Sequence, residues 1–195
     1  MDTTQLDRMI IENLEDLDAV VHRVHAIEEV IKKHLAEESR RWAAKRGWRF
    51  SALEDDEIWV APPEWQARGR DIWFELGWGP DDNDTGEPGE LWFDLCRWAG
   101  VGRGRLCLWL DWRGAGIPAW KATAGAHLDE MKQAGLLVTD GRLIPYVDCT
   151  PDSTLVAKGL VEGDLSEAYA PFRKALATAA AAVPILDPIM KKAAR

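Results

Sequence analysis

The sequence predicts an α+β fold with a long N-terminal helix, a mainly antiparallel, tryptophan-rich sheet of about four to six strands, and flanking and C-terminal helices. Apolar residues recur at helical spacing up to residue 47, and from residue 48 the spacing changes to the alternation typical of strands. Helical spacing returns after Pro118. We therefore expect a long helix or coiled coil over residues 1–47 and an α+β domain over residues 48–195.

The first 47 residues have the pattern of a coiled coil. Read as heptads, their a positions hold the aliphatic residues Ile10, Leu17, Val24 and Ile31. A helix of about 40 residues spans roughly 60 Å, which is longer than a domain of this size. It must therefore break into a hairpin, pack along a second copy of the chain, or be covered by the C-terminal helices of its own chain. If a second copy covers it, these four residues form a homodimer interface.

Four segments then read as strands, residues 57–60, 71–78, 90–98 and 105–113, because they are rich in Trp, Phe, Ile and Leu and are separated by Pro/Gly/Asp loops. Three of them share an aromatic–apolar–acid–apolar phrase, Trp73-Phe74-Glu75-Leu76, Trp92-Phe93-Asp94-Leu95 and Trp109-Leu110-Asp111-Trp112. Such strands present apolar residues on both faces. We therefore expect helices or loops to cover both sides of the sheet, with the acids near one rim.

The last third of the chain predicts helices around one more hairpin. A helical pattern runs from Pro118 to Gly135, and an Asp140-Gly141 turn separates residues 136–138 from a strand at residues 143–147. Asp164 with Glu167 has the spacing of a capping box and predicts the start of a last helix. Pro184 and Pro188 are expected to end that helix.

The acids of the shared phrase, Glu75, Asp94 and Asp111, are candidate metal ligands, because carboxylates on neighbouring strands suit Mg²⁺. The order helix–strands–helix–strand resembles the core of the PD-(D/E)XK nucleases, a family in which Asp/Glu-x-Lys follows an Asp on the next strand. Here Arg113 stands where that family has its Lys, and arginine stays protonated and cannot act as a base. The alternative interpretation is thus a divergent, metal-dependent nuclease-like enzyme of PD-(D/E)XK topology, which we expect to be inactive. Otherwise the acids pair with nearby arginines or reach solvent.

Other enzyme and membrane signals are missing from the sequence. It contains no Gly-x-x-x-x-Gly-Lys phosphate loop and no Gly-x-Ser-x-Gly elbow, so we expect no cofactor. Three cysteines cannot pair evenly, and charges throughout the first fifty residues are unlike a signal peptide. No apolar run approaches 18 residues, so we expect no membrane segment and a cytoplasmic location, in the host cell if a phage encodes the chain.

The strongest signal of function is the distribution of charge. The net charge is −9, yet residues 51–100 alone hold thirteen acidic residues, three arginines and six of the eleven tryptophans. Direct binding of nucleic acid is disfavoured by this charge, whereas a basic protein surface, such as that of a nucleic-acid-binding complex, suits it. We expect the acids of one loop to attract that partner and two tryptophans beside the loops to hold it, namely Asp81, Asp82, Asp84 and Glu87 with Trp65 and Trp78.

The sequence therefore predicts a non-enzymatic protein-interaction module. Its acidic, tryptophan-rich profile is similar to that of small acidic proteins that occupy nucleic-acid-binding surfaces, as phage-encoded inhibitors of bacterial defence complexes do, anti-CRISPR proteins among them. The likeness is one of class and rests on no shared motif.

Overall fold

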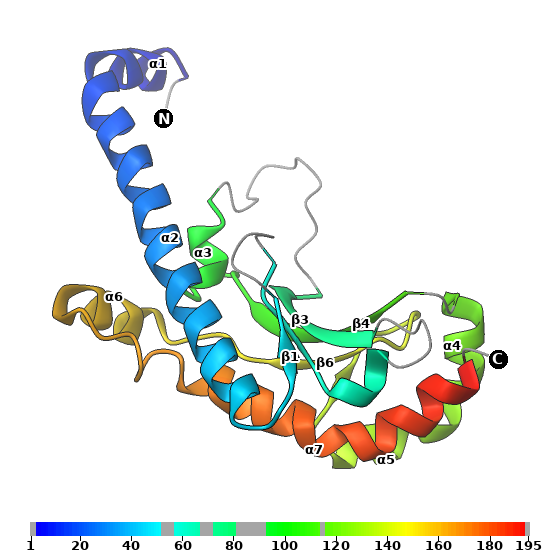
Figure 1. The fold of residues 1–195 in the computed structure, drawn as a ribbon. Helices are drawn as coiled ribbons and strands as arrows, with labels where there is room; N and C mark the ends of the chain where they lie inside the picture. The colour runs from blue at the N-terminus through cyan, green and yellow to red at the C-terminus, as the bar shows by residue number, and fades with distance from the viewer. Residues whose placement is uncertain (1–2, 52–56, 67–71, 81–92, 114–115, 194–195) are drawn as a thin grey trace.

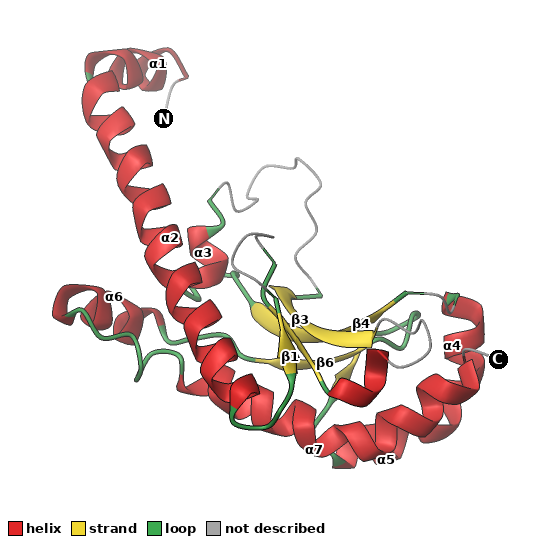
Figure 2. Ribbon diagram, in the orientation of Figure 1, coloured by secondary structure: helices red, strands yellow, loops and turns green. Residues whose placement is uncertain are grey.

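The computed structural model describes residues 3–51, 57–66, 72–80, 93–113 and 116–193. A six-stranded antiparallel sheet has helices packed on one face, and a long helix extends from its side (Figures 1 and 2). The order across the sheet is β1-β2-β3-β4-β6-β5. The predicted α+β class, the antiparallel sheet and the N-terminal and C-terminal helices are confirmed. The strands are β1 (Arg49–Phe50), β2 (Trp59–Ala61), β3 (Ile72–Trp78), β4 (Leu106–Trp112), β5 (Leu137–Val138) and β6 (Pro145–Asp148).

One face of the sheet forms the core. Val60, Phe74 and Leu110 lie opposite one another on β2, β3 and β4, and all three are buried. The C-terminal helix α7 (Ala170–Ala193) packs beneath this face, with Phe172 and Leu176 among its buried side chains (Figure 1). Burial of large apolar side chains on this face stabilises the fold because each removes its apolar area from water.

The N-terminal segment forms two helices, α1 (Thr3–Glu12) and α2 (Leu14–Ala44), rather than one continuous helix. Asn13 separates them, with φ −121° and ψ 25°, outside the helical range. Its side-chain Nδ2 donates to the carbonyl oxygen of Met9 at 2.7 Å. Asparagine competes in this way for backbone groups and so disrupts helices. Figure 1 shows α1 turned across the far end of α2.

The two halves of α2 have different surroundings. Ile31 and Leu35, in the second half, are 0% exposed and belong to the core cluster, whereas Leu17 in the first half is 41% exposed. The second half lies against β1 and a short helix, α3 (Leu95–Trp98). The predicted dimer interface is therefore divided. Ile31 packs within its own chain and is not available to a second copy, while Ile10 and Leu17 are exposed and Val24 is half-buried.

The strand predicted at residues 90–98 is wrong for its last part, because residues 95–98 form the helix α3. Asp94 pairs with Arg97 at 2.8 Å, an i, i+3 contact that fits a helical turn and that an extended strand would not allow. The backbone N–H of Leu95 donates to Oε1 of Glu28 at 2.7 Å, which ties the start of α3 to α2. Tertiary contacts thus override the strand-like composition here. Residues 90–92 lie outside the described part of the chain.

The helices after β4 are α4 (Ile117–Ala124), α5 (Leu128–Gln133), α6 (Ser153–Glu162) and α7. One 3₁₀ turn lies before β3, at Pro63–Gln66, and another between α4 and α5, at Gly125–His127. The predicted capping box is wrong: Oδ1 of Asp164 accepts from the backbone N–H of Ser166, while Glu167 pairs with Lys158 of α6 and α7 begins only at Ala170. A short turn satisfies the Asp164 carboxylate before any helix starts.

The expectation that Pro184 and Pro188 end the last helix is also wrong, since α7 continues through both to Ala193. Both prolines lie on the exposed side of α7, where water can bind the carbonyl groups that lose their partners. The opposite side, including Leu186 and Ile189, is buried in the core. Packing of that side offsets the cost of the two prolines. None of the helices among the described residues has the length and apolar character needed to cross a membrane.

Candidate functional site

The sheet face turned away from α7 carries a row of partly exposed aromatic and acidic side chains. Strand pairing places Trp59 of β2 opposite Glu75, Glu75 opposite Trp109 of β4, and Trp109 opposite Tyr146 of β6. All four are only half-buried. The cover expected on both sides of the sheet is therefore incomplete at these four residues. The reason is alternation: the aromatic and the acid of each strand share a face, so a carboxylate accompanies each tryptophan and keeps the face polar.

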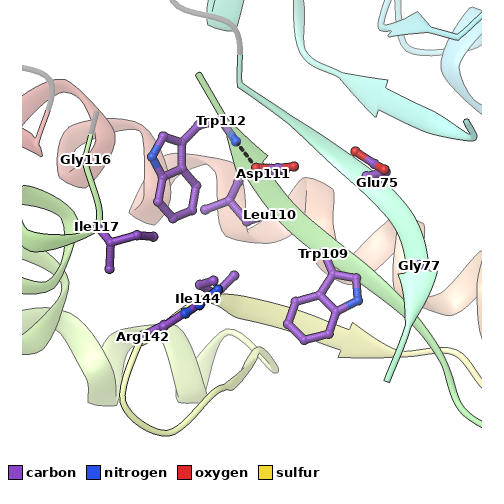
Figure 3. Close-up of a pocket in the computed structure, with 10 residues that line it drawn as sticks. All are labelled: Glu75, Gly77, Trp109, Leu110, Asp111, Trp112, Gly116, Ile117, Arg142 and Ile144. Atoms are coloured by element: carbon purple, nitrogen blue, oxygen red, sulfur yellow. Dashed lines mark hydrogen bonds between the residues drawn. The ribbon is translucent and has the colours of Figure 1, made fainter. Parts of the chain in front are cut away.

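A cavity of about 540 Å³ adjoins this open face, and its lining also includes Leu110 and Trp112 from the core face of β4 (Figure 3). Strands β3 and β4 form one side, and the start of α4 and the segment before β6 form the other. Its lining residues are Glu75, Gly77, Trp109, Leu110, Asp111, Trp112, Gly116, Ile117, Arg142 and Ile144. A second hollow of about 610 Å³ adjoins it, sharing Trp109, Arg142 and Ile144 and reaching Tyr146. Cavities of this size are typical of small-molecule sites.

Trp109 is held in a fixed orientation in the lining. Its Nε1 donates to the carbonyl oxygen of Trp78 at 2.8 Å, and its ring stacks on Tyr146 with 4.7 Å between centroids. Gly77 makes room for the indole, because a Cβ at that position would lie 3.3 Å from Cδ1 of Trp109. An aromatic ring fixed by neighbours loses little freedom when another ring stacks on it.

Two carboxylates stand at the β3–β4 side of the cavity. Trp73 pairs with Asp111 and Glu75 pairs with Trp109, so Glu75 and Asp111 are diagonal neighbours on one face. Oε2 of Glu75 accepts from Nε1 of Trp73 at 2.7 Å. Burial raises the pKa of Glu75, and the nearby acids Glu57 and Asp111 raise it further. The site thus concentrates acceptor oxygens that favour a donor-bearing ligand.

Arg142 brings a positive charge to the opposite side of the cavity. Its side chain is exposed, and it forms no ion pair with the acidic side chains of the described ranges. Its backbone N–H donates to the carbonyl oxygen of Asp140 at 2.7 Å, within the turn that precedes β6. In Figure 3 the side chain lies across the cavity from Glu75.

The three predicted metal ligands do not come together. Glu75 and Asp111 lie on the sheet, whereas Asp94 lies in the turn before α3 and is paired with Arg97. Within the described ranges, no group of three or more His, Cys, Asp or Glu side chains is placed to hold a metal ion. Because residues 95–98 are helical, the third strand of the supposed pattern does not carry its acid to the sheet.

The predicted partner-binding tryptophans have different environments from those expected. Trp65 is 1% exposed and packs on Phe74 at 5.3 Å between centroids, so its assignment to an exposed docking surface is wrong. Trp78 is half-buried against Trp98, edge to face at 4.9 Å. The four acids expected to attract the partner, Asp81, Asp82, Asp84 and Glu87, lie outside the described residues.

Trp109, Tyr146 and Arg142 were not predicted from the sequence as site residues. For Trp109 a signal was present, because Asp111 lies two residues further along the same strand and therefore shares its sheet face. Arg142 carried no signal, since a turn residue meets the cavity only through the packing of β6 against β4.

A second exposed feature is the N-terminal arm, defined as residues 3–27. Eight of its large apolar side chains are each at least 37% exposed: Leu6, Met9, Ile10, Ile11, Leu14, Leu17, Val20 and Val21. Figure 1 shows this arm projecting away from the sheet. Monomeric proteins rarely leave this many large apolar side chains exposed close together in the sequence.

No family model, no curated protein and no solved structure matches this chain. Its function is therefore inferred from these two surfaces.

Proposed function

We propose that this chain is a non-enzymatic protein-interaction protein. Two copies pair through the N-terminal arm, and the acidic residues of segment 51–100 bind a basic protein surface. The observation that carries the proposal is the run of exposed apolar side chains from Leu6 to Val21. Burying these side chains against a partner helix would stabilise the pair by about 25 cal/mol of free energy for every Å² of apolar surface removed from water.

A second copy is the partner that the arm suits best. The apolar stripe of α2 continues from Leu17 through Val24 to Ile31, where it enters the core of its own chain. A helix laid along the first half of α2 would extend that core outward, and the heptad spacing is the one that packs helix against helix.

The charges of α2 favour an antiparallel pair. Residues 14–18 hold three acidic residues and no basic one, whereas residues 22–26 hold one arginine, two histidines and no acid. An antiparallel crossing centred near Val20 places the acidic segment of each copy beside the basic segment of the other. A parallel pair would bring the two acidic segments together, at a cost in like-charge repulsion.

The acidic segment supports a basic partner. Residues 51–100 have a net charge of −10, which attracts a basic surface from about 8 Å at physiological salt. The specific role that we propose is an inhibitor that covers the nucleic-acid-binding surface of another protein. We place both in the cytoplasm, since Cys96, Cys107 and Cys149 are all free thiols, as in a reducing compartment.

The dimer is tested by light scattering after size exclusion. We expect the unmodified chain to have twice the monomer mass and the variant Ile10→Lys with Leu17→Lys to be monomeric. A matched control, Val101→Lys with Val161→Lys, changes two exposed apolar residues outside the arm and is expected to stay dimeric. An unmodified chain that is monomeric at a concentration of roughly tens of micromolar would refute the dimer.

Disulfide trapping tests the orientation. Antiparallel pairing places Leu17 beside Val24 of the partner, so a mixture of Leu17→Cys and Val24→Cys chains should form a mixed disulfide. Leu17→Cys alone should not cross-link to itself. Self-linking of Leu17→Cys chains would show a parallel pair.

The basic partner is tested with a lysine- and arginine-rich DNA-binding domain immobilised on a sensor surface. The four-residue neutralisation Asp81→Asn, Asp82→Asn, Asp84→Asn and Glu87→Gln should slow association and flatten its salt dependence. A control set outside the segment, Asp129→Asn, Glu130→Gln, Glu162→Gln and Glu167→Gln, removes the same charge and should have a smaller effect. If the two sets of substitutions changed the association rate equally, the acidic segment would only make the protein more soluble and would not bind the partner specifically.

A further inference from the structure

The cavity beside the open sheet face is lined by three kinds of chemical group, which lie at separate positions in it. The indole of Trp109 is the aromatic surface, Glu75 and Asp111 supply acceptor oxygens on one side, and Arg142 supplies a cation on the other (Figure 3). A ligand that uses all of them has a flat ring, donors along one edge and an anionic group at the far end.

The ring requirement follows from Trp109. Its ring already stacks on Tyr146, and its N–H is engaged by the Trp78 carbonyl, so the indole offers the cavity an aromatic surface rather than a hydrogen-bond donor. Flat heteroaromatic rings, nucleobases above all, stack on such surfaces. Trp112 at the end of β4 and Ile117 at the start of α4 add apolar surface to the lining.

The edge requirement follows from the two carboxylates. An ionised carboxylate only accepts hydrogen bonds, and it can accept two side by side. Among the nucleobases, guanine presents two adjacent donors, N1–H and the N2 amino group, on its Watson–Crick edge. Adenine and cytosine place an acceptor nitrogen beside their amino group, and that nitrogen would face a carboxylate oxygen. Glu75 and Asp111 therefore select guanine when they are ionised.

The anion requirement follows from Arg142. Its guanidinium is exposed at the rim and pairs with no acid of the described residues. The planar fork of donors on arginine matches two oxygens of a phosphate. A base stacked on Trp109 therefore directs its 5′-phosphate across the cavity to this side chain.

We propose that this cavity binds a guanosine 5′-phosphate, with the base stacked on Trp109, its donor edge on Glu75 and Asp111, and its phosphate on Arg142. The site is separate from the N-terminal arm and goes beyond the interaction proposed above. Its failure would leave the dimer and the basic partner untouched.

Isothermal titration of the full chain tests the ligand, with guanosine 5′-monophosphate, guanosine and adenosine 5′-monophosphate as probes at neutral pH. We expect the first to bind about tenfold more tightly than guanosine, which lacks the phosphate, and about tenfold more tightly than the adenine nucleotide. The proposal would be overturned if guanosine 5′-monophosphate gave no binding heat at roughly millimolar concentration. Equal affinity for the two nucleotides would also overturn it.

Two variants assign the roles. Glu75→Gln keeps an acceptor for Nε1 of Trp73 but presents a donor to guanine, and is expected to weaken binding of the guanine nucleotide about tenfold. Arg142→Gln, at an exposed position, is expected to abolish the preference for the nucleotide over guanosine. Lys174→Gln, an exposed charge removal on α7, is the matched control and should leave binding unchanged. Unchanged preferences in both cavity variants would show that the nucleotide binds elsewhere and would overturn the assignment.

Discussion

The first and second halves of α2 repeat the same apolar spacing, yet Leu17 and Val20 are exposed to solvent whereas Ile31 and Leu35 are completely buried. The second half lies beside β1, β2 and α3 and contributes to the core of the sheet domain. The first half extends beyond these elements. The apolar stripe thus determines which side of a helix can become buried. The neighbouring elements determine which turns of the helix are in fact buried.

The largest difference between the two halves should appear on truncating one leucine in each. Leu35→Ala leaves a cavity in the core and is expected to lower the free energy of unfolding by about 2–5 kcal/mol. Leu17→Ala should change it by less than about 0.5 kcal/mol at concentrations where the chain is monomeric. Urea denaturation of both variants measures the contrast. Similar losses would mean that the first half of α2 is packed within its own chain.

A smaller effect is expected beside the buried half, at Tyr169. Its hydroxyl donates to the carbonyl oxygen of Trp98 at 2.8 Å, and its ring lies 5.7 Å from that of His34 on α2. Tyr169→Phe keeps the ring and leaves the buried carbonyl without its donor, at a cost of about 1–3 kcal/mol. Chemical denaturation measures the loss. An unchanged midpoint would show that this bond contributes nothing to holding α3 against the turn that precedes α7.

The buried half should also make stability depend on pH through His34. Burial lowers the pKa of His34 from 6.5, with the cations Arg41 and Arg173 acting in the same direction and Glu38 opposing them. As the pH falls below 6.5, His34 becomes protonated in the unfolded chain before it does so in the folded chain. The free energy of unfolding should therefore fall with the pH.

His34→Gln should flatten that slope, and the exposed control His22→Gln should leave it in place. Thermal unfolding between pH 7.5 and 5 (about the range in which histidine titrates) compares them. A slope that persists in His34→Gln would assign the acid sensitivity to another group.

The smallest effect is expected on the arm itself. Arg8 and Glu12 form an i, i+4 ion pair at 2.6 Å between two exposed side chains. Such pairs contribute about 0.3–0.5 kcal/mol in salt-free water and less in salt. Arg8→Ala should therefore leave the unfolding midpoint unchanged within error, as measured by circular dichroism. A loss above about 1 kcal/mol would mean that α1 is docked on a partner that needs this pair.

Spacing and composition determined the fold class, because helical and strand periods are local properties of a few consecutive residues. They located the helical N-terminus, the strands predicted at 57–60, 71–78 and 105–113, and the last hairpin with the helices around it. They failed where distant groups decide the outcome. Residues 95–98 became helical against Glu28 of α2, and α7 continued through Pro184 and Pro188 because its other side is buried.

The candidate site was predictable only in part. Glu75 and Asp111 stood out from the sequence, since acids embedded in apolar strands are rare enough to indicate a role. Their neighbours Trp109 and Arg142 did not, because strand register and the packing of β6 against β4 bring those residues to the same cavity. The apolar pattern of a helix likewise predicts which side of it is apolar. Only the tertiary structure decides which turns of that side are buried within the chain and which stay exposed to a partner.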